Sequence, residues 1–212
     1  MKELNRLKKP FLLLIGCTLF VPHLFAQEMS MSMPSQQQEA PETKNVFLHM
    51  MDTMMVKMEQ IPVGKSADFV FTAEMIPHHQ GAIAMANYEI ANGKDFTMIQ
   101  LAKSILAEQT TESQQMNLWI VDPSFNTGTL PKEFQQEMDQ TMEIMMKELP
   151  PDNTLKHTDQ SFAAVMIPHH QAAINMAKVI LKYTTDQRTA SFAKQLLSLE
   201  QMEIEQMSTF IK

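Results

Sequence analysis

Apolar residues recur along this chain with the spacing of helices. Two segments each place four large apolar side chains three or four residues apart, on one helical face: Met51, Met54, Met55 and Met58, then Met138, Met142, Met145 and Leu149. Residues 45–60 and 131–149 are therefore expected to be helices. A loop ends each of them, with Pro62 and Gly64 after the first and Pro150 and Pro151 after the second. No segment alternates apolar and polar residues over a useful length, so the pattern predicts an all-α protein.

The remaining pattern completes three helices in each half of the chain. A second helix is expected over 68–92 and again over 159–183, and a third over 95–120 and 186–211. Each of these four helices starts at an aspartate that can cap the free backbone N–H groups: Asp68, Asp95, Asp159 and Asp186. Pro77 and Pro168 fall inside the second helices, where we expect a kink or a break.

The second half of the chain repeats the first at a constant offset of 91 residues. Residues 47–120 align with 138–211 without a gap and share about 25 identities in 74 positions. Because the loops have also kept their lengths, the two halves should have the same fold. The prediction is a four-helix bundle formed by two tandem three-helix repeats with pseudo-twofold symmetry, and the short Met-bearing helices at its ends or sides.

The N-terminal residues have the pattern of an export signal. Four basic residues precede an apolar run over 11–21, and Ala26 offers a cleavage point before Gln27. A lipoprotein signal at Cys17 and an uncleaved anchor are alternatives, although the apolar run is short for a membrane span. The predicted organisation is a signal peptide over 1–26, a disordered Met/Ser/Gln-rich segment over 27–44, a first repeat over 45–121, a linker over 122–130 and a second repeat over 131–212.

The net charge and the Cys and Met content limit the kinds of partner and metal site that this chain can have. Cleavage after Ala26 would leave 13 basic against 23 acidic residues, a net charge of −10, which argues against nucleic acid and anionic membranes as partners. Cleavage would also remove the one Cys, so a soft-metal site in the periplasm or outside the cell would have to use thioethers. The chain has 21 Met residues but only one Trp and two Tyr, and plastic core packing alone is one explanation for this excess.

The most specific repeat is the hexapeptide MIPHHQ, at residues 75–80 and 166–171. On a helix, a Met three or four residues before the two His can approach either imidazole, and a second Met lies two turns further on. The two adjacent His are about 100° apart around the helix, so we expect that they cannot both point into the core. Thioether with imidazole is a copper-type donor set, with Cu(I) preferred and Cu(II) possible. The candidate ligands are His78, His79, Met75 and Met85, with His169, His170, Met166 and Met176.

Further donors lie outside the hexapeptides. Met54, Met55, Met145, Met146 and His49 are additional candidate ligands, although core packing also explains the Met spacing. Met29, Met31 and Met33 would form a flexible capture arm, or a tail that contributes only solubility. For the His pairs, the alternative is a structural role in which His78 and His169 bind the backbone carbonyls that the Pro residues leave free.

Several catalytic classes find no support in the sequence. A di-iron carboxylate bundle requires Glu-x-x-His, but Met75 and Met166 stand three residues before the first His of each pair. No nucleophile elbow, phosphate loop, CxxC or HExxH is present. We therefore expect a protein that is not an enzyme.

The motif M-I-P-H-H-Q-x-A-I-x-M-A at 75–86 and 166–177 resembles the signature of the domain of unknown function 305 family. So does the pattern Glu112, Met116 and Trp119, echoed by Glu203, Met207 and Phe210. The resemblance covers nearly all of 47–211. It implies a ferritin-like helical bundle in an exported bacterial protein, and a copper role for the two Met/His clusters, because some Met-rich members are implicated in copper binding and copper tolerance.

The leading hypothesis is an exported copper-binding protein that sequesters or shuttles Cu(I) or Cu(II) and contributes to copper tolerance. Its partners would be copper ions and other periplasmic copper-handling proteins, without nucleic acid or, after signal cleavage, a membrane. An envelope structural or interaction module with structural His pairs is the first alternative. A cuprous oxidase is a weaker one, because two Tyr and one Trp offer no clear redox relay.

Overall fold

The computed structural model describes residues 43–62 and 64–211, and the predicted signal peptide and most of the Met/Ser/Gln-rich segment lie outside this part. The described residues form helices and contain no strand, so the all-α prediction is confirmed. Six α-helices follow in order: α1 (Val46–Met58), α2 (Ala67–Asn92), α3 (Phe96–Ile120), α4 (Lys132–Glu148), α5 (Thr158–Tyr183) and α6 (Gln187–Phe210). Two short 3₁₀ helices, η1 (Pro123–Asn126) and η2 (Asp152–Thr154), lie in the connections. None of the helices described is long and apolar enough to span a membrane.

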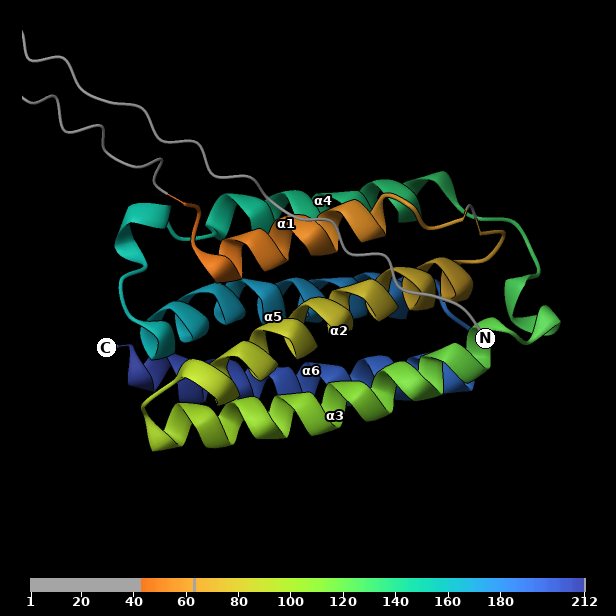
Figure 1. Cartoon of the computed structure of the whole chain (residues 1–212). Coiled ribbons are helices and arrows are strands. Elements are labelled where there is room, and N and C mark those ends of the chain that lie inside the picture. Colours follow the sequence, from red (N-terminus) through yellow and green to blue (C-terminus); the bar gives the residue numbers. More distant parts are fainter. Residues whose placement is uncertain (1–42, 63, 212) are drawn as a thin grey trace, which may run out of the picture. The chain divides into compact units, whose positions relative to one another are not determined.

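The long helices α2, α3, α5 and α6 form a ferritin-like four-helix bundle, as predicted (Figure 1). Helix α2 packs on α3, α5 packs on α6, and α2 packs against α5 to join the two repeats. The short helices α1 and α4 lie along one side of the bundle, α1 over α2 and α4 over α5. Helices α2 and α5 therefore form a middle layer that is covered on both sides, and the second helix of each repeat carries the hexapeptide.

The core is built largely from Phe and Met side chains. Phe47, Phe71, Phe134 and Phe162 are almost fully buried, and so are Met51, Met54, Met138 and Met145. Burial of each side chain of this size stabilises the fold by roughly 1.5–3 kcal/mol. Met54 lies so close to α2 that a Cβ atom at Gly81 would come within 2.9 Å of its sulfur. Gly81 thus allows α1 to approach α2 closely, one turn beyond the first His pair.

The aspartates at the helix starts divide into two groups. Asp95 and Asp186 cap α3 and α6 as predicted, each accepting two backbone N–H bonds. Asp68 and Asp159 do not cap: Ser66 caps α2, and α5 has no side-chain cap. Instead, Asp159 accepts the N–H groups of Lys94 and Asp95 at 2.8 and 2.7 Å, and Asp68 accepts the hydroxyl of Thr184. Both therefore bind the loop between the long helices of the other repeat.

Helices α2 and α5 continue through Pro77 and Pro168 without interruption, so the chain does not break before the His pairs. Proline removes one hydrogen bond of a helix interior, but packing on both sides of the middle layer retains the helical backbone.

Candidate functional site

All four His of the two hexapeptides lie in the bundle interior. His78, His79, His169 and His170 are each fully buried, so the expectation that only one His of each pair could point into the core is wrong. Two residues 100° apart on a surface helix would have different environments. Helices α2 and α5 have neighbours on several sides, and a side chain that leaves either helix in two directions still meets protein.

His78 and His169 lie against one another where the two repeats meet. Their ring centroids are 3.8 Å apart with an interplanar angle of 32°. The Nε2 of His169 donates a hydrogen bond to the carbonyl oxygen of His78 at 3.1 Å. Burial is the main cause that lowers the pKa of both rings well below 6.5, and neighbouring His charges lower it further. Both imidazoles are therefore neutral at pH 7.

His79 and His170 each meet a glutamate of the third helix of their own repeat. His79 Nε2 donates to Glu112 at 2.9 Å, and His170 Nε2 donates to Glu203 at 2.8 Å. Sequence analysis did not include Glu112 and Glu203 among the site residues. The signal was available, since both glutamates occupy the same repeat position, 33 residues after the second His of each pair.

The two halves of the site differ at one position. Glu200 of α6 stands where α3 has Gln109, and the Gln109 amide donates to Glu200 at 3.2 Å, joining the two helices. The second oxygen of Glu200 lies 3.7 Å from Nδ1 of His170. Burial first, and then the charges of neighbouring glutamates, raises the pKa of Glu200 well above its usual 4.5. The second repeat thus offers His170 two carboxyl groups.

Five ring nitrogens in this cluster have no hydrogen-bond partner among the described residues: both of His78, and Nδ1 of His79, His169 and His170. A neutral imidazole that donates through Nε2 carries a lone pair on Nδ1. A carboxylate that holds one ring nitrogen while the other binds a metal is the usual orientation of metal-ligating His. Each buried nitrogen without a partner would cost about 1–3 kcal/mol. A neutral His78 carries a proton on one of its two nitrogens, so at most four of the five nitrogens offer a lone pair.

The four Met of the predicted clusters accompany these rings. Met75, Met85, Met166 and Met176 are fully buried on α2 and α5, within two turns of the His pairs. No group of three or more His, Cys, Asp or Glu side chains in the described part of the chain is arranged to hold a metal ion. The interior therefore offers imidazole nitrogens and thioether sulfurs beside the carboxyl groups of Glu112, Glu200 and Glu203.

The remaining predicted ligands lie apart from the His cluster. Met54 and Met145 belong to the core between the short and the long helices, each only 1% exposed. Met55 and Met146 line a separate cavity between α1 and α4. His49 is exposed on α1, and the capture arm at Met29, Met31 and Met33 lies outside the described residues.

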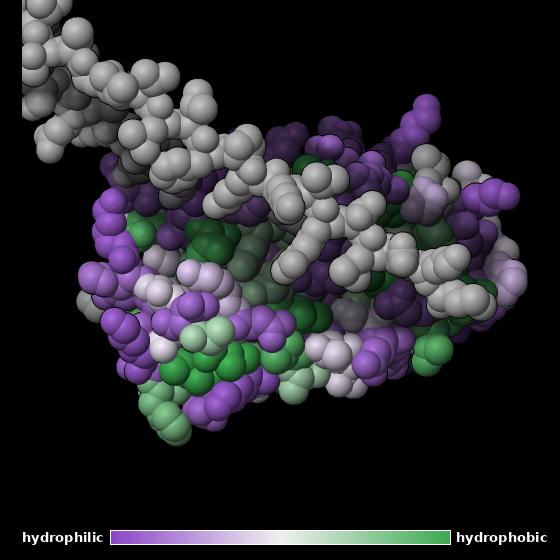
Figure 2. Space-filling model, viewed as in Figure 1, coloured by the Kyte–Doolittle hydropathy of each residue, from purple (hydrophilic) through white to green (hydrophobic). Residues whose placement is uncertain are grey.

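A groove lies between α3 and α6, and Glu203 of the cluster lines it. It has a volume of about 400 Å³, and Glu108 and Glu203 line it. Burial, followed by the charges of Glu203 and Glu112, raises the pKa of Glu108 to about 7. At one end of the groove Phe96 is 75% exposed at the start of α3, where Figure 2 shows apolar side chains gathered on the surface. Glu203, which lines the groove, is also the residue that accepts the hydrogen bond of His170.

The chain matches a protein family and several solved structures. A family model described as "Domain of unknown function (DUF305)" matches residues 21–120 and 122–211. No curated protein matches the chain.

Solved structures share the fold. A structure described as "CopM in the Ag-bound form (by soaking)" is 26% identical, covers 68% of this chain and 93% of its own, and superposes with a TM-score of 0.52. A second, "CopM in the Cu(II)-bound form", is 24% identical over 68% of this chain and 95% of its own, with a TM-score of 0.51. A DUF305 fragment from Deinococcus radiodurans is 21% identical over 71% of this chain and 98% of its own, also at 0.51.

Proposed function

The chain belongs to the DUF305 family, and on that premise we propose that it is an exported copper-binding protein that holds Cu(I), and also Cu(II), at its two Met/His clusters. One observation carries the proposal. Five ring nitrogens of His78, His79, His169 and His170 are buried without a protein partner, on helices that also bury four Met side chains. Imidazole nitrogen and thioether sulfur together favour copper over the harder ions.

Two carboxylates orient one imidazole ring in each cluster. Glu112 and Glu203 accept hydrogen bonds from Nε2 of His79 and His170, which leaves Nδ1 of each ring to bind the ion. A thioether carries no proton to lose, so the Met donors work in a mildly acidic exterior as well. The lowered pKa of His78 and His169 keeps these two rings available as neutral donors in the same range.

The comparison with CopM supports a soft ion. That protein was solved with silver and is 26% identical to this chain. Silver(I) and copper(I) carry the same charge and both prefer soft donors. The ion would enter through the groove between α3 and α6, which reaches Glu203, and sequestration or transfer of copper would then contribute to copper tolerance. Fully buried donors suit the retention of an ion better than turnover of a substrate, so the proposed role is binding and not catalysis.

One observation favours a second candidate, an envelope structural module. His169 donates to the carbonyl of His78 in the other repeat, so this ring already makes a structural contact. The carbonyl is not the one that Pro77 leaves free, which would belong to Ala73, four residues earlier. The contact therefore joins the repeats and does not repair the helix at the proline.

The test is an anaerobic Cu(I) titration of the chain from Gln27 against a competing chromogenic chelator. Two variants remove the donors: His78, His79, His169 and His170 replaced by Ala, and Met75, Met85, Met166 and Met176 replaced by Leu, a change that conserves volume. We expect the first to lose tight binding and the second to weaken it. Replacement of the exposed His157 by Ala serves as the control and should bind as the wild type does.

Thermal unfolding of the same proteins separates the two candidates. An ion that binds only the folded state raises its stability, by about 2.7 kcal/mol at a free concentration of 100 times Kd. A copper protein should show this gain, and the Leu variant should show less of it. If Cu(I) affinity and stoichiometry survive in both donor variants, the copper assignment is wrong, and lower stability without any change in binding would favour the structural module.

A further inference from the structure

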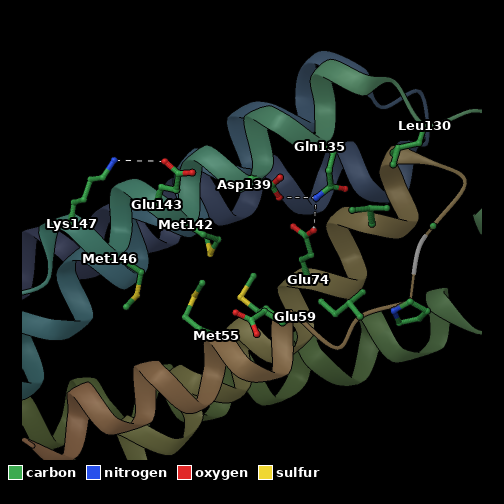
Figure 3. A pocket seen from close by; sticks show the side chains of 15 residues that line it. Met55, Glu59, Glu74, Leu130, Gln135, Asp139, Met142, Glu143, Met146 and Lys147 are labelled. Atoms are coloured by element: carbon green, nitrogen blue, oxygen red, sulfur yellow. Dashed lines mark hydrogen bonds and ion pairs between the residues drawn. The ribbon is translucent and has the colours of Figure 1, made fainter.

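A second site lies on the opposite side of the middle layer, in the cavity between α1 and α4 (Figure 3). Its volume is about 850 Å³. Small-molecule sites are typically clefts of roughly 300–1,000 Å³ with mainly apolar walls and a few polar groups. The cavity has this size and this kind of wall, and none of the four buried His lines it.

The apolar wall consists largely of Met side chains. Met55 of α1 and Met146 of α4 occupy the same position in the two repeats and both line the cavity. Met142 brings a third sulfur, and Figure 3 shows all three side chains directed into the space between the helices. Met side chains are flexible and polarizable, so such a wall can fit apolar bodies of different shapes.

The polar groups of the cavity are almost all acidic. Four carboxyl groups line it, those of Glu59, Glu74, Asp139 and Glu143, against the one ammonium group of Lys147. Lys147 lies 3.6 Å from Glu143 on its own helix, so its charge is already paired. An apolar cavity with this excess of negative charge attracts cations and repels anions.

Glu74 holds the central place among these groups. It extends from α2 toward α4, where the amide of Gln135 donates to it at 3.3 Å and to Asp139 at 2.9 Å (Figure 3). No cationic side chain of the described residues pairs with this carboxyl group. The equivalent position in the second repeat is Val165, so the acid is particular to this cavity.

We propose that the cavity between α1 and α4 binds an organic cation with an apolar body, whose positive charge pairs with Glu74 while its body packs against Met55, Met142 and Met146. A hard divalent ion would require about six oxygen ligands and would leave the thioethers without a role. A bare soft ion would occupy only a small part of the 850 Å³. The ligand class that uses both the carboxylate and the apolar wall is an amphipathic ammonium compound. This inference does not depend on copper binding at the His pairs.

The experiment is calorimetric titration of the chain from Gln27 at pH 8.5, well above the ordinary pKa of a carboxyl group, with three probes that share one apolar body. These are 4-phenylbutyltrimethylammonium, 4-phenylbutanol and 4-phenylbutyrate. We expect the cation to bind with a Kd about tenfold lower than that of the alcohol, because one partly buried charge pair contributes a factor of this size. The anion should not bind. Equal binding of all three probes would overturn the proposal, and so would binding of none.

Two variants locate the site. Glu74→Gln should lower the affinity for the cation to that for the alcohol, whereas Glu133→Gln, an exposed acid of α4 outside the cavity, should change neither. Met146→Trp fills the cavity from a side chain that is 36% exposed, so folding should be retained and both probes should lose affinity. Binding that persists unchanged in Glu74→Gln and Met146→Trp would overturn the assignment to this cavity. Cu(I) binding at the His pairs should not change in Glu74→Gln, which keeps the two proposals separable.

Discussion

His78 and His169 occupy the same position in the two hexapeptides, and their surroundings in the bundle change their chemistry. Both rings are fully buried and lie 3.8 Å apart, centroid to centroid. The hexapeptide predicted imidazole donors next to thioethers, and the structure places the donors in the bundle interior with their pKa lowered. The pairing of these two rings depends on contact between residues 91 positions apart, which no local pattern contains.

The lowered pKa values predict acid sensitivity. Because the folded-state pKa of each ring lies below the unfolded value of about 6.5, the unfolded chain binds more protons as the pH falls through that value. The contribution of these two rings to the free energy of unfolding should therefore decrease from pH 7.5 downward and level off only below their folded-state pKa. Glu74, whose pKa is raised to about 7, acts in the opposite sense as the pH falls from 7 to 4.5. Glu200, whose pKa is also raised, acts in the same sense as Glu74.

Urea unfolding of His169→Gln isolates this effect. Gln can still donate to the His78 carbonyl but does not titrate, so its stability should depend less on pH between 7.5 and 5 than that of the wild type. The matched control is His157→Gln, at an exposed histidine just before α5, which should follow the wild-type curve. Equal pH dependence in wild type and His169→Gln would contradict burial of a neutral ring.

At the scale of the helices, local signals predicted the elements well but misassigned two aspartates. Periodicity and proline positions located all six helices to within a few residues, and the caps at Asp95 and Asp186 were correct. Asp68 and Asp159 have the same local preference for an N-cap. Backbone and hydroxyl donors of the other repeat bind them instead, because the bundle brings the end of each second helix beside the start of the other.

These contacts between the repeats predict that loss of Asp159 lowers the free energy of unfolding more than loss of Asp68. Asp159→Ala leaves the N–H groups of Lys94 and Asp95 without their acceptor and should lower the free energy of unfolding by about 1–3 kcal/mol. Asp68→Ala removes one hydroxyl bond, from Thr184, and should cost only about 0.5–1.5 kcal/mol. Chemical denaturation of both variants checks the order, and a larger loss at Asp68 would contradict it.

At the scale of the whole molecule, each repeat depends on the other for its core. The second helix of one repeat packs against that of the other, and His78 and His169 lie buried at this contact. The first repeat alone, residues 43–126, would expose His78, Met75 and the apolar residues around them. Since both repeats contain the same hexapeptide at the shared interface, we expect this fragment to form a homodimer that reproduces the pseudo-twofold arrangement.

Light scattering and circular dichroism of the fragment test this expectation. A helical dimer whose helicity falls on dilution would support it, because association and folding are then coupled. A stable helical monomer would show instead that one repeat completes its own core, and the dependence of each half on the other would be disproved.

Helical periodicity and the gapless duplication were sufficient to establish six helices, their order and a symmetric bundle, because these properties follow from local spacing and from identical loop lengths. The types of metal donor, imidazole and thioether, could be predicted for the same reason, since each hexapeptide contains two His and one Met. The partners of the donors were not: Glu112 and Glu203 bind the His rings from another helix, and Glu74 faces a cavity whose far wall belongs to the other repeat. Burial, pairing and pKa depend on residues that only helix packing brings together, so the tertiary structure alone determines them.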